Sequence, residues 1–321
     1  MLSVLAVTFP FFALVLAGYL AARRRLLPFE AIAGLNTFVL FFALPCLLYR
    51  FGAGTPIAQL LDPSALLTWV ACALLMVAGT VKCSLNARIR WNDASFGALV
   101  AAFPNTGFMG VPLVVALLGA KAAGPAILTI LIDLVVTSSL CIALSRLDGA
   151  DEHGAALAAK KALQGMALNP MPWAILLGGF SSALQVKPVG PILNTIGLLA
   201  DAASPVALFT IGAVLARSQF VGARGEHGPL PARDFVPVSL AKLLLHPLLV
   251  WSAGQGVRAL GLPLDAFTLK VMVLVAALPS ASNVSLLAER FGADTGRIAR
   301  IILLTTAAAF VTFSAAVALL E

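Results

Sequence analysis

Long apolar runs separated by short polar segments dominate the chain. A helix needs about 20 apolar residues to cross the hydrocarbon core of a bilayer. Runs of about this length recur along the whole sequence, so the pattern predicts an all-α integral membrane protein with ten transmembrane helices. The predicted spans cover, roughly, residues 3–22, 31–49, 64–83, 96–118, 123–144, 170–186, 191–215, 236–254, 266–288 and 298–320.

Composition supports a lipid environment. Of the 321 residues, 60% are apolar and 11% are charged, whereas a soluble chain carries about a quarter charged residues. The first apolar run, Leu2–Ala22, has no basic residue before it and Arg23–Arg25 after it. A signal peptide has the opposite polarity, so this run is predicted to be a first span with its N-terminus outside.

The basic residues predict the orientation of the ten spans. With the N-terminus outside, the inner loops hold fifteen of the 21 Lys and Arg residues and the outer side holds five, while Lys242 lies inside span eight. Cytoplasmic loops of membrane proteins carry such an excess of basic residues. We therefore expect a multi-pass protein with both termini outside, and we ascribe the net charge of +7 to these loops rather than to nucleic-acid binding.

The longest polar segment suggests an internal duplication. It covers residues 145–169, a predicted cytoplasmic linker, and separates five spans in residues 1–144 from five in residues 170–321. Ala101–Asn105 in span four resembles Ala276–Ser280 in span nine. Each half has an odd number of spans, so the second repeat must be inverted relative to the first. Inverted repeats are typical of secondary transporters.

Spans four and nine are predicted to be broken helices. Pro104 and Pro279 each remove a backbone donor from the middle of a span. Polar residues suited to helix capping follow each proline. Irregular backbone at this depth is tolerated only where protein buries it or where it lines a wet cavity.

A restarted helix presents free N–H groups and the positive end of its dipole to such a cavity, which favours an anion. The alternative is a plain proline kink without a ligand. The predicted substrate-binding residues follow the two prolines: Asn105, Thr106, Gly107, Ser280, Ser282 and Asn283.

The same stretches resemble the auxin efflux carrier family, including short bacterial members named as malonate or other carboxylate transporters. The resemblance rests on Pro104–Pro112, on Ala203–Phe209 with Gly212, and on Lys242 with Pro247. It implies two inverted five-helix repeats, crossing helices four and nine, an elevator-type motion and a homodimer. The long central loop of the plant members is missing, which implies a prokaryotic carrier in the bacterial cytoplasmic (inner) membrane. The bias of the basic residues then predicts that both termini are periplasmic.

The implied fold is similar to that of sodium-coupled bile acid carriers. Those carriers place an acidic residue and a glutamine beside the span-nine break to hold sodium. Here the break offers only Ser280, Ser282 and Asn283. This departure makes a sodium-coupled carrier the alternative rather than the main hypothesis.

Three ionisable residues are predicted to lie deep in the membrane. They are Asp133, Asp201 and Lys242, and His246 follows Lys242 by one helical turn. Such residues are costly in lipid and are usually functional. Asp133 and Lys242, with His246, are candidates either for proton coupling or for an ion pair that only joins helices. Asp201 is predicted to be structural or to face a dimer partner.

The motifs exclude some enzyme classes. No G-x-S-x-G, H-E-x-x-H or Walker motif occurs, and no cofactor or metal site is predicted. The sequence thus predicts a secondary transporter, not an enzyme, that carries a small organic anion such as malonate, another carboxylate or an auxin-like acid. An anion channel or receptor is the remaining alternative.

Overall fold

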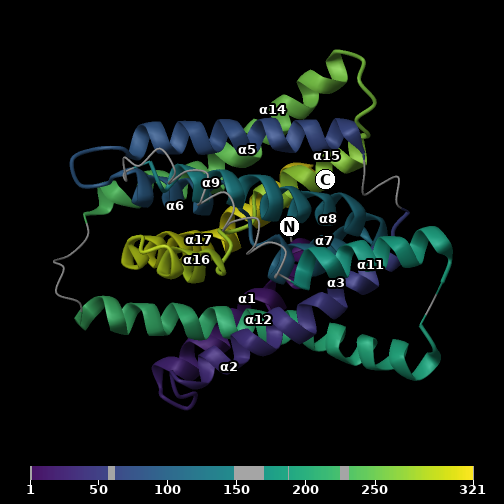
Figure 1. Ribbon diagram of the computed structural model, residues 1–321, viewed down its shortest axis with the longest axis horizontal. Coiled ribbons are helices and arrows are strands. Elements are labelled where there is room, and N and C mark those ends of the chain that lie inside the picture. Colours follow the sequence, from purple (N-terminus) through teal and green to yellow (C-terminus); the bar gives the residue numbers. More distant parts are fainter. Residues whose placement is uncertain (1, 57–61, 148–169, 187, 225–230, 321) are drawn as a thin grey trace. The chain divides into compact units, whose positions relative to one another are not determined.

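The computed structural model describes residues 2–56, 62–147, 170–186, 188–224 and 231–320 (Figure 1). Helices make up most of this part of the chain. The Cα positions divide it into two units. Unit 1 comprises residues 1–62, 106–128 and 169–224, and unit 2 comprises residues 63–105, 129–168 and 225–321. Each unit therefore draws residues from both predicted five-helix repeats.

Seven helices in the described residues are long and apolar enough to cross a membrane. They agree with seven of the ten predicted spans. The predicted spans four and nine are interrupted, and span six is the shorter helix α11. The structure therefore supports an all-helical integral membrane protein, while the ten-helix inverted arrangement remains a prediction. The predicted linker lies largely outside the described residues, because these omit residues 148–169.

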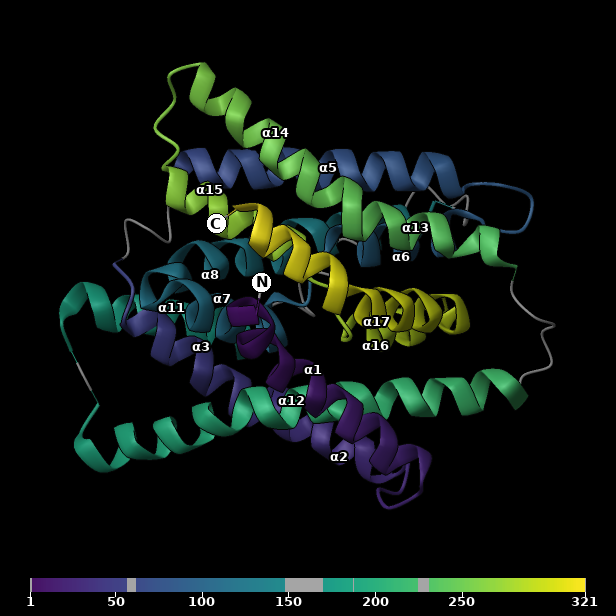
Figure 2. The same cartoon turned by 180° about the vertical axis from the view of Figure 1, so that it is seen from behind.

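Unit 1 is built around the long helix α12, which both views show crossing α1 (Figures 1 and 2). Gly18 and Gly212 allow the close approach. A Cβ added at Gly18 would overlap the carbonyl oxygen of Phe209, and one added at Gly212 would overlap that of Val15. The elements of unit 1 are α1 (Leu2–Arg23), α2 (Ala31–Phe38), η1 (Val39–Ala43), α3 (Leu44–Ala53), η2 (Thr106–Gly110), α7 (Val111–Leu118), η3 (Ala120–Ala122), the first part of α8 (Ala123–Ile132), α11 (Pro170–Leu184) and α12 (Gly190–Arg224).

Unit 2 contains the remaining helices, with α5 beside α14 (Figures 1 and 2). Its core is largely apolar, with Trp69, Phe96 and Phe313 fully buried. The elements of unit 2 are the end of α8, α5 (Pro63–Ser84), α6 (Trp91–Ala102), η4 (Asp133–Thr137), α9 (Ser138–Leu144), η5 (Ala232–Asp234), α13 (Val236–Leu240), η6 (Ala241–Leu245), α14 (His246–Ala259), α15 (Ala266–Ala276), α16 (Val284–Arg290) and α17 (Thr295–Leu320).

Several spans contain a single π-helical turn. The turns η1, η2 and η6 end two residues before Pro45, Pro112 and Pro247, respectively. Proline lacks an N–H group and its ring collides with the carbonyl four residues earlier. A wider turn just before the proline relieves that collision and lets the span continue. Such turns are frequent at functional sites.

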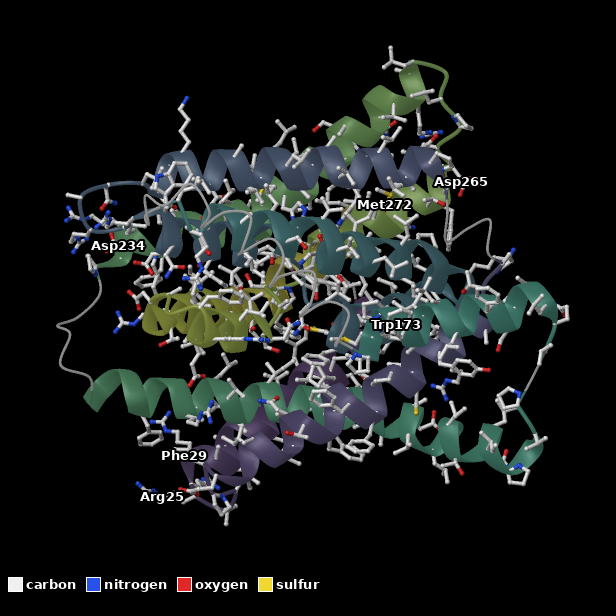
Figure 3. All side chains as sticks on the ribbon, in the orientation of Figure 1. Arg25, Phe29, Trp173, Asp234, Asp265 and Met272 are labelled. Atoms are coloured by element: carbon white, nitrogen blue, oxygen red, sulfur yellow. The ribbon has the colours of Figure 1, made fainter. Side chains whose placement is uncertain are left out.

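A polar network closes one end of unit 2. Figure 3 labels Asp234 at this end and Asp265, which caps α15, at the other. Arg88 donates two hydrogen bonds to the Asp234 carboxylate, at 2.9 and 2.7 Å. The buried Arg297 donates to the carbonyl oxygens of Asp234 and Asp93, at 2.8 and 2.7 Å. The network thus joins segments that the charge pattern assigns to inner loops.

Candidate functional site

The two helix breaks meet inside unit 2. Pro104 and Ser280 form an antiparallel β-bridge. The Asn105 amide donates to the carbonyl of Pro279 at 2.8 Å, and the Ala281 amide donates to that of Phe103 at 3.0 Å. Segments more than 170 residues apart in sequence are thereby held together at the point where each helix is interrupted. The bridge satisfies backbone groups that the sequence pattern predicted to be free.

Ser280 serves the bridge rather than an open cavity. Its hydroxyl donates to the carbonyl of Val100 at 2.6 Å, and its amide donates to the Thr305 hydroxyl at 3.3 Å. The side chain is fully buried. The Ser280 hydroxyl therefore bonds the Val100 carbonyl in the last turn of α6. Its hydroxyl hydrogen is not available to a ligand in this arrangement.

Asn105, Ser282 and Asn283 keep free hydrogen-bonding capacity. No hydrogen bond to these three side chains occurs within the described residues, and the amides of Ser282 and Asn283 also lack acceptors there. Asn105 is 4% exposed and Ser282 is 8% exposed. Among the polar residues that follow Pro279, Asn283 lies at the N-cap position of α16, but its side chain makes no capping bond to this helix. Its carboxamide is thus left for another partner.

The predicted helix-end dipole is weaker than expected at the second break. The helix that follows, α16, has only seven residues, and a short helix sums few peptide dipoles. Specific N–H groups and carboxamides, rather than a dipole, are therefore the groups that this break offers for hydrogen bonding.

Thr106 and Gly107 fall in unit 1, directly after Asn105 in the chain. They open the π turn η2 rather than a regular helix. Thr106 is fully buried. Gly107 leaves room beside Leu44, whose Cδ2 would lie 3.6 Å from an added Cβ.

Asp133 is fully buried in unit 2, at the first position of the π turn η4. One carboxylate oxygen accepts a hydrogen bond from the Trp69 indole at 3.1 Å and another from the Thr137 hydroxyl at 2.9 Å. The second oxygen, Oδ2, has no partner in the described residues. A buried carboxyl oxygen without a partner is costly and is a natural position for a proton.

Lys242 and His246 form the second part of this cluster. Both are fully buried, and Lys242 Nζ lies 3.0 Å from His246 Nδ1, as the one-turn spacing predicted. Lys242 also donates to the carbonyl of Ala276 at 2.8 Å. No direct ion pair joins Asp133 to Lys242 among the described residues. Instead the Trp69 ring packs against the His246 ring, with 5.4 Å between centroids, and bonds Asp133.

Asp201 pairs with Arg50 within unit 1. Asp201 Oδ1 lies 2.6 Å from Arg50 Nη1, and the side chains are 70% and 40% exposed, respectively. This contact ties α12 to α3.

Sequence reasoning missed Trp69 and Thr305. A single tryptophan or threonine in an apolar span carries no local signal for a hydrogen bond to a distant segment. The bonds from Trp69 to Asp133 and from Ser280 to Thr305 join residues 64 and 25 positions apart.

Comparison with known proteins agrees with the transport prediction. The family model described as "Membrane transport protein" matches residues 3–317. A protein of Rhizobium meliloti (strain 1021) named "Putative malonate transporter" is 30% identical over 309 residues, which cover 95% of this chain and 92% of the relative. Escherichia coli (strain K12) "Uncharacterized transporter YfdV" is 27% identical over 294 residues, covering 89% and 88% of the two chains.

A third relative matches over a similar length. An "Uncharacterized transporter" of Methanothermobacter thermautotrophicus is 27% identical over 299 residues, which cover 91% of this chain and 90% of the relative. These matches span nearly the whole chain, including both helix breaks and the buried cluster of Asp133, Lys242 and His246. The chain therefore belongs to the membrane transport protein family, that of the auxin efflux carriers, and is a multi-pass membrane transport protein rather than an enzyme.

Proposed function

We propose that this protein is a secondary transporter of a small organic anion, such as malonate or another carboxylate, and that the paired breaks of unit 2 hold the substrate. The observation that carries the proposal is the set of hydrogen-bonding groups left without partners beside the bridge: the carboxamides of Asn105 and Asn283 and the amides of Ser282 and Asn283.

These groups suit a carboxylate. Each carboxamide NH₂ and each backbone N–H can donate to an oxygen, and hydrogen bonds to a charged acceptor are about twice as strong as neutral ones. None of the four groups carries a full positive charge, so a bound anion could also leave. A dicarboxylate such as malonate could use both asparagines, whereas a monocarboxylate with an apolar body would use one.

The named relative gives independent support for the substrate class. The Rhizobium protein is named for malonate, and the departure of the span-nine break from the bile acid carriers, with Ser280, Ser282 and Asn283 in place of an acidic residue and a glutamine, favours a carrier without sodium coupling. A sodium-coupled carrier and an anion channel or receptor are the alternatives. A carrier gives saturable counterflow in proteoliposomes, whereas a channel conducts without exchange.

We extend the proposal to an elevator-type motion in a homodimer of ten-span protomers. Unit 2 contains Pro104 and Asn105 of the first break, the whole of the second break, the bridge between them and the buried charged cluster. Movement of unit 2 as one body would therefore carry the site without breaking these bonds.

Substitution of the asparagines tests the site. Asn105→Ala or Asn283→Ala should remove a charge-assisted contact of about 1.5–3 kcal/mol, which weakens binding roughly ten- to more than a hundredfold. Malonate and a panel of mono- and dicarboxylates would first be tested for uptake into proteoliposomes. Calorimetry would then measure binding of the transported anion to purified, monodisperse variants.

Asn194→Ala is the matched control, because Asn194 is exposed on α12 in unit 1 and should bind like the parent. Unchanged affinity in both Asn105→Ala and Asn283→Ala would rule out the breaks as the binding site and leave them as hinges.

A further inference from the structure

The buried ammonium of Lys242 contacts the break itself. Helix α15 ends at Ala276, the last helical residue before the break in span nine. Lys242 donates to the carbonyl oxygen of that residue at 2.8 Å. The last carbonyls of a helix have no partner inside the helix, and the helix dipole makes this end negative. A cation that donates N–H bonds is the group that best satisfies such an end.

The other residues of the break are held by the bridge. The Pro279 carbonyl accepts from Asn105, and the Ala281 amide donates to Phe103. Lys242 fixes the start of the same segment, at Ala276. The stretch from Ala276 to Ala281 is therefore held at its start by the Lys242 side chain together with amide hydrogen bonds back into α15, and at its end by the bridge. Ser282 and Asn283 follow directly.

His246 and Trp69 keep the ammonium in place. His246 Nδ1 can accept from Lys242 only if the ring proton lies on Nε2, and Nε2 is the ring nitrogen that has no partner in the described residues. The Trp69 ring packs against the His246 ring and donates its own N–H to Asp133. The ammonium of Lys242 thus contacts His246 on one side and the Ala276 carbonyl on the other.

We propose that Lys242 is a positioning residue for the anion site: a tethered cation that holds the end of α15 and so sets the geometry of Ser282 and Asn283. This inference rests on the proposed function for its binding readout. It differs from an ion-pair role, because the partner is a backbone carbonyl rather than Asp133. It differs from a plain packing role, because a free cation of the right shape should replace the side chain.

Chemical rescue tests the inference. Lys242→Ala keeps Cβ and removes three carbons and the ammonium, which together match n-propylammonium. Lys242→Ala should bind malonate about ten- to a hundredfold more weakly than the parent, and millimolar n-propylammonium should restore most of the affinity. Tetramethylammonium, which has no N–H donor, and 1-propanol, which has no charge, should not restore it.

Two further variants separate charge from packing. Lys242→Met fills the space without a charge, so it should bind weakly and not respond to the amine. Lys270→Ala removes a lysine of α15 whose side chain has no hydrogen bond or ion pair to the break within the described residues, and it should bind like the parent. Full affinity in Lys242→Ala or Lys242→Met, or a loss in Lys242→Ala that n-propylammonium does not reverse, would overturn the proposal.

Thermal unfolding separates this inference from the proposed function. If the parent binds no carboxylate, the proposed function fails, and the midpoint of unfolding then decides the role of Lys242. We expect n-propylammonium to raise the midpoint of Lys242→Ala and to leave the parent unchanged. An equal response of both proteins would overturn the positioning role.

Discussion

At the residue scale, Asp133 and Lys242 are accommodated by neutral groups rather than by each other. Asp133 Oδ1 accepts from Trp69 and Thr137, and Lys242 donates to the Ala276 carbonyl. A direct pair would cancel both charges and lock two spans together. The observed separation leaves Oδ2 of Asp133 without a partner in the described residues. This oxygen is therefore a candidate for reversible protonation.

Asp133→Asn tests whether protonation of this carboxyl group is coupled to transport. Asparagine keeps an oxygen that can accept from Trp69 and Thr137, but it cannot take up a proton at the second position. We expect pH-driven uptake into proteoliposomes to be abolished while anion exchange partly persists. Asp201→Asn, which alters the exposed pair with Arg50, should leave the pH dependence unchanged. A normal pH response in Asp133→Asn would favour a structural role for the carboxyl group.

At the element scale, backbone geometry is adjusted where the sequence places proline or glycine in a span. The π turns before Pro45, Pro112 and Pro247 keep three helices continuous. Pro104 and Pro279, by contrast, end a helix, because the bridge between them offers the freed backbone groups new partners. A proline therefore either stays within a continuous helix or ends it. The outcome depends on whether a neighbouring segment offers partners to the freed backbone groups.

Gly212→Ala should break the close packing of α1 on α12. The new Cβ would overlap the backbone of Val15 and Tyr19, and overpacking of this kind typically costs about 1–3 kcal/mol. Thermal unfolding in detergent should show a lower midpoint for this variant. Gly197→Ala is the matched control on the same helix, where an added Cβ meets nothing within 4 Å. A midpoint for Gly212→Ala as high as that of Gly197→Ala would contradict the close approach.

At the scale of the whole molecule, the predicted orientation in the membrane rests on the basic residues alone. The segments of unit 2 that gather around Asp234 and Arg297 are those the charge pattern assigns to the inside. The termini are predicted to be periplasmic and residues 145–169 cytoplasmic.

Cysteine labelling in intact cells tests this orientation. The native Cys46, Cys72, Cys83 and Cys141 would first be replaced by serine or alanine. In that background Ser3→Cys should react with an impermeant maleimide, and Ala155→Cys should react only after the cells are opened. Labelling of Ala155→Cys but not Ser3→Cys in intact cells would reverse the topology.

The sequence by itself determined the membrane class, the approximate spans and the positions of the two breaks. These features are local: an apolar run must be long enough to cross the bilayer, and a proline alters the helix in which it lies. The one-turn spacing of Lys242 and His246 was likewise readable, because helical geometry places residues four apart on one face.

Only the tertiary structure decided which groups at the breaks are occupied and which remain free. Ser280 and its acceptor Val100 are 180 residues apart, and Lys242 and Ala276 are 34 apart. No periodicity within one span reports such a partner. The hydrogen-bonding needs of a buried polar group are fixed by its chemistry, but the group that meets them is set by how distant segments pack. For this reason the sequence offered Ser280 as a ligand and left Lys242 open between two roles, whereas packing placed both on backbone carbonyls.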